Sequence, residues 1–292
     1  MNILTFDIEE WYLDTHHFPL GNTYFKAYDH YLKSTLDLLD ERNAKATFFC
    51  VGGMATFFPD IVKSISERGH EIGCHSNSHA WLNTFDRKGL REDTLTAIKS
   101  LEDITGKKVI SYRAPAFSIG ESNKWVFEVL AECGIERDAS IYPAARQFGG
   151  FESFPADRPS VIKIGDYDIK EFPICLTHLM GNNIAYSGGG YFRFFPLSFI
   201  KNTMKKSDYV MSYFHLWDLM YHSMRLTDKD TFEKYYKTKA TLKNRIVRMV
   251  KGSIGTKGAF QKMSSLVRTF DFINLEEADT IVDWQEANIV QL

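Results

Sequence analysis

Two histidines four residues apart, His75 and His79, are the pair in this chain whose spacing first suggests chemistry. On a helical turn, this spacing places both imidazoles on one side, close enough to hold a single divalent metal ion. Alone, such a pair is more often an ordinary polar surface pair. A metal centre built on it also needs a carboxylate, because two neutral nitrogen ligands leave the ion short of charge and of coordination.

Two carboxylates near the N-terminus can complete such a site. Asp7 and Glu9 end a short apolar run that predicts a buried strand, and residues two apart in a strand point to the same face. We expect Glu9 to be the third metal ligand beside His75 and His79. Asp7 is then free to act as general base on a water that the ion activates, which is hydrolytic chemistry. Glu10 is expected to be a surface acid.

Three residues further along the chain could serve the same reaction. Arg113 could pair with Asp7, orienting its carboxylate and keeping it ionised. His215 could protonate a leaving amine, a role whose ideal pKa lies near neutral pH. Asp138 could either orient His215 or cap a turn with Ser140, and the sequence leaves both interpretations open.

The predicted elements show how residues so distant in sequence could meet. Apolar runs that predict strands alternate with helical patterns, and the polar residues named above follow the strands. Strands are expected at 1–8, 46–51, 71–74, 109–112 and 135–139, and helices at 24–43, 59–68, 86–105 and 123–133. This alternation predicts an α/β fold of parallel strands with crossover helices, in which the functional residues gather at the strand ends.

The second half of the chain has a less regular pattern. It predicts a hairpin of strands at 161–164 and 168–173, a glycine-rich loop at 188–193, a helix at 196–206, a strand at 209–214, helices at 231–250 and 259–268, and a possible strand at 270–274. The basic run 234–251 could contact an anionic glycan carrier or a membrane face, although a solvated helix face is the commoner case. We expect one domain over 1–292, with a core to about residue 220 and a helical extension, 221–292, packed on it.

The composition is that of an ordinary globular protein. The 292 residues are 44% apolar and 25% charged, with a net charge of −2, which excludes disordered and fibrous classes. No apolar run approaches the roughly 20 residues that span a bilayer, and the strand-like start differs from a leader peptide, so we expect a cytoplasmic protein. The cysteines lie apart in apolar runs and are expected to be reduced thiols without disulfides: Cys50, Cys74, Cys133 and Cys175.

Four motifs together resemble the polysaccharide deacetylase family, also known as the NodB-homology or carbohydrate esterase family 4 group. They are T-F-D-I-E at 5–9, H-S-N-S-H at 75–79, R-A-P-A-F at 113–117 and F-H-L-W-D at 214–218. The chain is most similar to a subgroup that often accompanies exopolysaccharide gene sets. That subgroup shares an F-D-x-E-E-W motif at 6–11, R-A-P-x-F-S at 113–118, D-x-S-I-x-P at 138–143 and G-G-G-Y-F-R at 188–193.

The resemblance implies a single distorted (β/α) barrel of about seven strands and a metal-dependent hydrolysis of an N-acetyl or O-acetyl group. It implies Asp7 as the base, His75 and His79 as metal ligands, Arg113 as the residue that orients the base, and His215 as the general acid. Zinc is the first choice of metal, with Co, Ni, Mn or Fe as alternatives. The implied partner is an acetylated amino-sugar glycan or its nucleotide- or lipid-linked precursor, with no nucleic acid.

Two positions depart from the commonest family pattern. Ile8 stands where a second aspartate usually binds the metal, so Glu9 must replace that ligand. Ala116 stands where an aromatic residue often follows the proline of the third motif. An oxyanion contact would then come from the Ala116 backbone N–H, with Phe117 displaced by one position.

Aromatic and basic residues near these motifs are candidates for sugar contact. Tyr191 and Arg193 could face the sugar, with Arg193 meeting an acidic group, and Trp217 or Trp11 could stack on a ring. Two other functions stay open: an amide or cyclic-imide hydrolase of the same superfamily, and a glycan-binding relative without catalytic turnover.

Overall fold

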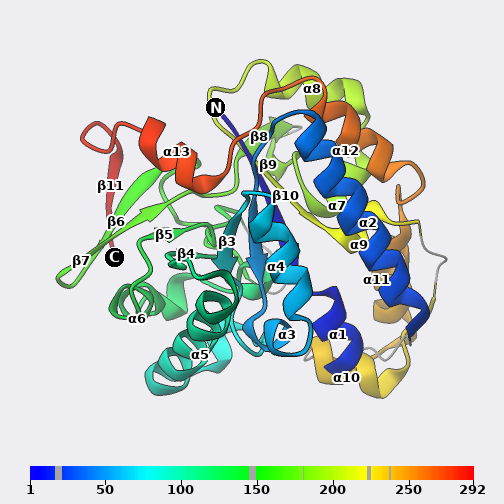
Figure 1. Ribbon diagram of the computed structural model, residues 1–292, viewed down its shortest axis with the longest axis horizontal. Coiled ribbons are helices and arrows are strands. Elements are labelled where there is room, and N and C mark those ends of the chain that lie inside the picture. The colour runs from blue at the N-terminus through cyan, green and yellow to red at the C-terminus, as the bar shows by residue number, and fades with distance from the viewer. Residues whose placement is uncertain (17–21, 145–148, 180, 222–224, 237) are drawn as a thin grey trace.

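The computed structural model describes residues 1–16, 22–144, 149–179, 181–221, 225–236 and 238–292, and its centre is one mostly parallel sheet (Figure 1). The strands of that sheet are β1 (Asn2–Ile8), β2 (Thr47–Cys50), β3 (Glu71–Cys74), β4 (Ser111–Tyr112), β5 (Arg137–Asp138), β6 (Ser160–Ile164), β7 (Tyr167–Glu171), β10 (Val210–His215) and β11 (Asn288–Gln291). They pair in the order β10-β1-β2-β3-β4-β5-β7-β6-β11. A separate hairpin consists of β8 (Leu176–Leu179) and β9 (Asn182–Ala185).

Helices surround this sheet and form most of the connections between its parallel strands. The α-helices are α1 (Glu10–His16), α2 (Asn22–Glu41), α3 (Gly52–Phe57), α4 (Pro59–Glu67), α5 (Arg87–Thr105), α6 (Val126–Glu132), α7 (Gly189–Phe194), α8 (Leu197–Met204), α9 (Leu216–Leu219), α10 (Lys229–Tyr236), α11 (Leu242–Ser253), α12 (Ala259–Val267) and α13 (Leu275–Ile281). Three short 3-10 turns are η1 (Leu82–Thr84), η2 (Pro115–Phe117) and η3 (Glu121–Asn123). Within the described ranges, no helix has the length and apolar character needed to cross a membrane.

The α/β fold with a parallel sheet is confirmed, whereas the predicted distorted barrel of about seven strands is not. The strands from β10 through β1 to β5 and β7 pair in parallel, while β6 pairs antiparallel with β7 and parallel with β11. Across the part of the chain that the structure covers, β10 and β11 end the sheet and do not pair with each other. Each carboxyl end of a parallel strand therefore opens onto one common edge, as α/β folds require for a shared site.

The alternation of side chains along β1 determines which residues reach that site. Leu4, Phe6 and Ile8 are fully buried in the larger hydrophobic core. Ile3 belongs to a second core, and Asp7 lies four residues further along the same face of the strand. The carboxylate of Asp7 is thus buried on the side opposite to the larger core.

Several predicted elements differ from the observed ones. The glycine-rich segment 188–193 contains helix α7, and the single helix expected at 231–250 is two helices, α10 and α11, with Lys237 outside the described residues. Helix α11 begins anew because the Thr241 side chain accepts a hydrogen bond from the Asn244 N–H. The strand expected at 270–274 is a single bridge between Ile3 and Ile273. The extension also supplies β11, so it is not purely helical.

His70 provides a prediction about acid sensitivity. Its ring is buried against Phe48, with 5.2 Å between the ring centroids, and neither ring nitrogen has a hydrogen-bond partner within the described residues. Burial, together with the charge of Lys45, lowers its pKa to about 4. In the unfolded chain His70 binds a proton as the pH falls below about 6.5, whereas in the folded chain it stays neutral until about pH 4. Above pH 6.5, His70 therefore does not lower the free energy of unfolding. As the pH falls toward 4, it lowers that free energy by up to about 3 kcal/mol.

We expect His70→Leu to flatten the fall in urea-unfolding free energy between pH 7 and pH 4.5 relative to the unmodified chain. The comparison is between slopes, because the leucine also changes packing at every pH. An equal fall in both proteins would show that His70 does not carry this acid sensitivity.

Candidate metal and catalytic site

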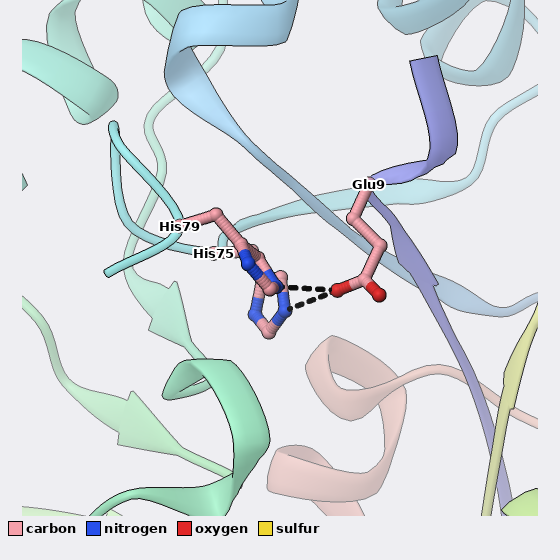
Figure 2. A group of neighbouring side chains, drawn as sticks. All are labelled: Glu9, His75 and His79. Carbon is pink, nitrogen blue, oxygen red and sulfur yellow. Dashed lines mark ion pairs between the residues drawn. The ribbon is translucent and has the colours of Figure 1, made fainter. Parts of the chain in front are cut away.

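Three side chains converge at the carboxyl ends of β1 and β3, as Figure 2 shows. Glu9 follows β1, while His75 and His79 belong to the segment that follows β3. The Oε2 atom of Glu9 lies 2.5 Å from Nε2 of His79 and 3.4 Å from Nε2 of His75. One ligand atom from each residue lies within 4.8 Å of the other two. Burial opposes ionisation of Glu9, but His79, His215 and His75 outweigh it and hold the pKa of Glu9 well below its usual value.

This cluster fits a divalent metal ion. The Nδ1 atom of His75 lies 2.7 Å from the Arg113 carbonyl oxygen, so Nδ1 donates its proton there and the Nε2 lone pair faces Glu9. The other ring nitrogens of the pair, Nε2 of His75 and both nitrogens of His79, are buried without a partner of hydrogen-bond geometry in the described residues. Buried polar atoms rarely lack partners. Two imidazoles and one carboxylate are also the donor set of hydrolytic metal sites.

The loop that carries the histidines is not the helical turn that their spacing suggests. Residues 75–80 have no helical structure, and both Ser76 and His79 have positive φ angles, 62° and 53°. The Asp93 carboxylate, from α5, accepts four hydrogen bonds from the loop, given by the backbone N–H groups of Asn77 and Ser78 and by the hydroxyls of Ser76 and Ser78. These bonds hold a backbone shape that the loop sequence alone does not favour.

We expect Asp93→Ala to weaken divalent metal binding by about 10- to 100-fold, as losses of residues that orient metal ligands do. Competition with a chromogenic chelator measures this affinity. Asp103→Ala, on the exposed side of the same helix, is the matched control and should leave the affinity unchanged. If Asp93→Ala retains full affinity, the loop does not depend on this carboxylate.

Arg113 is fully buried beside Asp7. Its Nη1 donates to Oδ1 of Asp7 at 2.9 Å and to the Thr5 hydroxyl at 2.7 Å, while Nε donates to the Ala139 carbonyl at 3.0 Å. The guanidinium also lies over the Phe49 ring, 4.3 Å from its centroid. The structure thus places Arg113 where its charge-assisted hydrogen bond orients the Asp7 carboxyl group.

His215 lies at the end of β10, directly opposite Asp7 in the strand register. Its Nε2 is 3.7 Å from a carboxylate oxygen of Asp7 and 3.7 Å from one of Glu9, and its Nδ1 is 2.8 Å from Oδ2 of Asp218. Burial disfavours the imidazolium, but the carboxylates of Glu9, Asp218 and Asp7 outweigh it and raise the pKa of His215 well above its usual value. His215 is therefore suited to hold a proton beside Asp7 and Glu9.

The carboxylate that binds His215 is Asp218, which the sequence reasoning missed. Asp138 instead accepts hydrogen bonds from the Ser140 backbone N–H at 2.8 Å and hydroxyl at 2.7 Å, which is the turn-capping alternative. Asp218 was visible as the last residue of F-H-L-W-D, three positions after His215. In the structure the two residues form a capping interaction at the start of α9.

Arg193 meets an acidic group, but that group is part of the chain. Its Nε lies 3.3 Å from Oδ1 of Asp218, and its terminal nitrogens donate to the carbonyls of Lys251 and Gly252. The guanidinium is nine-tenths buried. These contacts link the partner of His215 to the end of α11, rather than directing Arg193 toward a sugar.

Some of the other residues expected to contact substrate are accessible to a ligand, whereas one is buried in the core. Ala116 has a positive φ of 56°. The hydrogen bonds that close the turn at η2 are donated by the N–H groups of Phe117 and Ser118, and not by that of Ala116. Phe117 is buried and packs edge-on against Tyr213, with 5.1 Å between centroids. Tyr191 is 45% exposed on α7. Ala116 and Tyr191 thus remain candidates for ligand contact, whereas the Phe117 ring lies in the core.

Trp217 lies on α9, two residues after His215, and is partly exposed. Its backbone N–H donates to Oε1 of Glu10 at 2.9 Å. Glu10 is buried, so the expectation of a surface acid is wrong, and burial together with neighbouring Glu9 raises the pKa of Glu10 to about 7. No feature of the sequence indicated that Glu10 accepts a hydrogen bond from the backbone of α9.

Comparison with known proteins identifies two family segments. Residues 3–137 match the family described as polysaccharide deacetylase, and residues 139–279 match a domain of unknown function (DUF3473). A peptidoglycan-N-acetylglucosamine deacetylase of Bacillus cereus is 33% identical over 106 residues, which are 36% of this chain and 48% of that protein. A chitin deacetylase of Pestalotiopsis is 35% identical over 104 residues, which are 33% of this chain and 35% of that protein. The chain thus matches half or less of the length of these curated relatives.

The fold is shared with a solved structure over nearly the whole chain. A crystal structure from Mycobacterium smegmatis, assigned as a polysaccharide deacetylase, superposes with a TM-score of 0.64 at 20% identity and covers 99% of this chain and 92% of that one. At this identity the likeness concerns the fold alone. The match to the polysaccharide deacetylase family thus covers residues 3–137, the part of the chain that carries Glu9, His75 and His79.

Proposed function

We propose that this protein is a metal-dependent hydrolase that removes the acetyl group from an N-acetylated sugar of a glycan. The observation that carries the proposal is the buried cluster of Glu9, His75 and His79 with Asp7 and His215 beside it. The curated relatives named above act on peptidoglycan or chitin, which supports an N-acetyl amide as the bond cleaved. An O-acetyl ester is the alternative bond.

The side chains divide the chemistry between them. A divalent ion held by Glu9, His75 and His79 would supply Lewis acidity and lower the pKa of a coordinated water. Asp7, oriented by Arg113, accepts the proton of the attacking water. His215 donates a proton from Nε2 to the leaving amine, because Nδ1 is committed to Asp218.

The backbone N–H of Ala116 is our candidate for contact with the developing oxyanion, in a turn whose positive φ angles set its direction. Zinc is the metal we propose, since two histidines and one carboxylate form a common hydrolytic zinc site, with Co, Ni, Mn or Fe as alternatives. We also propose membership of the exopolysaccharide-associated subgroup, on the F-D-I-E-E-W and G-G-G-Y-F-R motifs. A nucleotide- or lipid-linked precursor as substrate and a cytoplasmic location stay predictions, which substrate profiling and cell fractionation would check.

Hydrolysis over a panel of substrates tests the proposal, measured as acetate release for the acetylated compounds and as ring opening for the imide. The panel contains chitin oligosaccharides, peptidoglycan fragments, a nucleotide-linked N-acetylated sugar, an O-acetylated sugar and a cyclic imide, each with and without a chelator. We expect chelator-sensitive release from an N-acetylated sugar. Hydrolysis of the imide alone would favour the related amide hydrolases, and glycan binding without turnover of any substrate would favour a non-catalytic relative.

A further inference from the structure

Helix α11 carries an apolar stripe that faces solvent. The helix has no buried residue. Leu242, Ile246 and Val250 repeat every four residues, so they lie on one face, with Val247 beside them. These four side chains, and Ile254 just beyond the helix, are 38% to 62% exposed. A helix whose apolar face is solvent-exposed over its whole length lacks the packing partner that such a face normally has.

Contacts on the other side of α11 fix the direction of this stripe. Arg245 donates from Nε to the Thr227 carbonyl, and Arg248 lies over the Tyr236 ring, 4.4 Å from its centroid. At the end of the helix, the carbonyls of Lys251 and Gly252 accept from Arg193. Figure 1 shows α11 at the periphery of the molecule, far from the β11 edge of the sheet. The polar side of the helix therefore holds it in place and the apolar side points outward.

The charge around this stripe is strongly positive. Residues 234–270 contain no Asp or Glu and ten basic residues: Lys234, Lys237, Lys239, Lys243, Arg245, Arg248, Lys251, Lys257, Lys262 and Arg268. The rest of the chain therefore holds all 37 acidic residues but only 25 of the 35 basic ones. Lys243 and Lys251, which flank the stripe, are exposed and belong to none of the ion pairs found among the described residues.

We propose that α11 docks this protein on the surface of an anionic lipid bilayer. A helix with an aliphatic face and flanking lysines lies in the membrane interface, where the apolar side chains enter the acyl boundary and the ammonium groups reach the phosphates. A second copy of the chain on a two-fold axis would bring the same basic face against itself. A nucleic acid would take the charges but leave the aliphatic stripe in water.

The docking face continues toward the catalytic residues. The backbone of Gly255 lies against Arg193, where a side chain at that position would clash with the Arg193 carbonyl. Phe194, which follows Arg193 in the sequence, is 66% exposed. Arg193 also holds Asp218, the partner of His215. The membrane face and the general acid candidate are thus joined through one buried side chain.

Vesicle flotation with the full chain tests this docking. The probes are vesicles of phosphatidylglycerol mixed with phosphatidylcholine, and vesicles of phosphatidylcholine alone. We expect binding to the anionic vesicles, weakened by high salt, and little binding to the neutral ones. Lys243→Gln with Lys251→Gln should weaken the partition constant roughly thirty-fold, and Ile246→Ser with Val250→Ser roughly tenfold or more.

Matched controls make the same changes elsewhere on the surface. Lys88→Gln with Lys99→Gln removes two exposed lysines from α5, and Ile281→Ser with Ile289→Ser removes two exposed isoleucines. Neither should change vesicle binding. Docking is refuted if the controls and the α11 variants bind alike, if single-stranded DNA binds instead of vesicles, or if the stripe variants only convert a dimer to a monomer. The assay needs no substrate, so its result is independent of the proposed deacetylase activity.

Discussion

Asp7→Asn is expected to lower kcat for acetate release by about 10²- to 10⁴-fold while leaving the divalent metal bound. Asparagine keeps the shape of the side chain and an oxygen that accepts from Arg113, which donates to Asp7 at 2.9 Å. It cannot accept a proton from water at neutral pH. The loss should therefore fall on the chemical step and not on metal retention or folding.

Metal content and activity must be measured on the same preparation of Asp7→Asn. Asp14→Asn changes another buried carboxyl, on α1 beside Tyr28, and serves as the control for an amide placed near the N-terminus. Loss of metal from Asp7→Asn, or retention of near-normal kcat, would show that Asp7 is not the base.

Glu9→Ala is expected to have the second large effect, which is loss of metal. Removing the Glu9 carboxylate, which lies 2.5 Å from His79, leaves the two histidines as neutral ligands, and we expect affinity to fall by more than about 100-fold. At a free zinc concentration of about 100 Kd, the unmodified chain gains about 2.7 kcal/mol of stability from binding. The thermal shift that reports this gain should be absent from Glu9→Ala and His79→Ala.

The thermal-shift experiment needs a control variant in which all three metal ligands are unchanged. Asp7→Asn is that control, because it alters the neighbouring carboxylate and should still respond to zinc. A normal zinc shift in Glu9→Ala would remove Glu9 from the ligand set and reopen the choice between the two carboxylates.

Much of the site was predictable because period-two alternation and strand ends are local features of sequence. Asp7 and Glu9 reach one site because residues two apart in an extended segment share a face. His75, Arg113 and His215 were placed together because each ends or follows a parallel strand, and such ends meet at one edge of the sheet. The interaction of Arg113 with Asp7 follows from that placement.

The missed features depend on contacts between distant elements. Asp93 is one of many charged residues on α5, and only the folded chain shows that it holds the histidine loop. The hydrogen bonds from Arg193 to Lys251 and Gly252 join segments nearly sixty residues apart in the sequence. No local sequence pattern predicts that these segments meet. Glu10 was expected at the surface because an acid after a strand is usually solvated, but α9 packs over it.

The most direct test of the metal site is anomalous X-ray scattering from crystals grown with zinc, measured on both sides of the zinc absorption edge. The site built by Glu9, His75 and His79 predicts one strong peak about 2.0 to 2.2 Å from Nε2 of both histidines and from a Glu9 carboxylate oxygen. Asp7 should be hydrogen-bonded to Arg113 and outside that first coordination distance. A peak bonded to Asp7 instead of Glu9, or no peak at the histidines, would contradict the account.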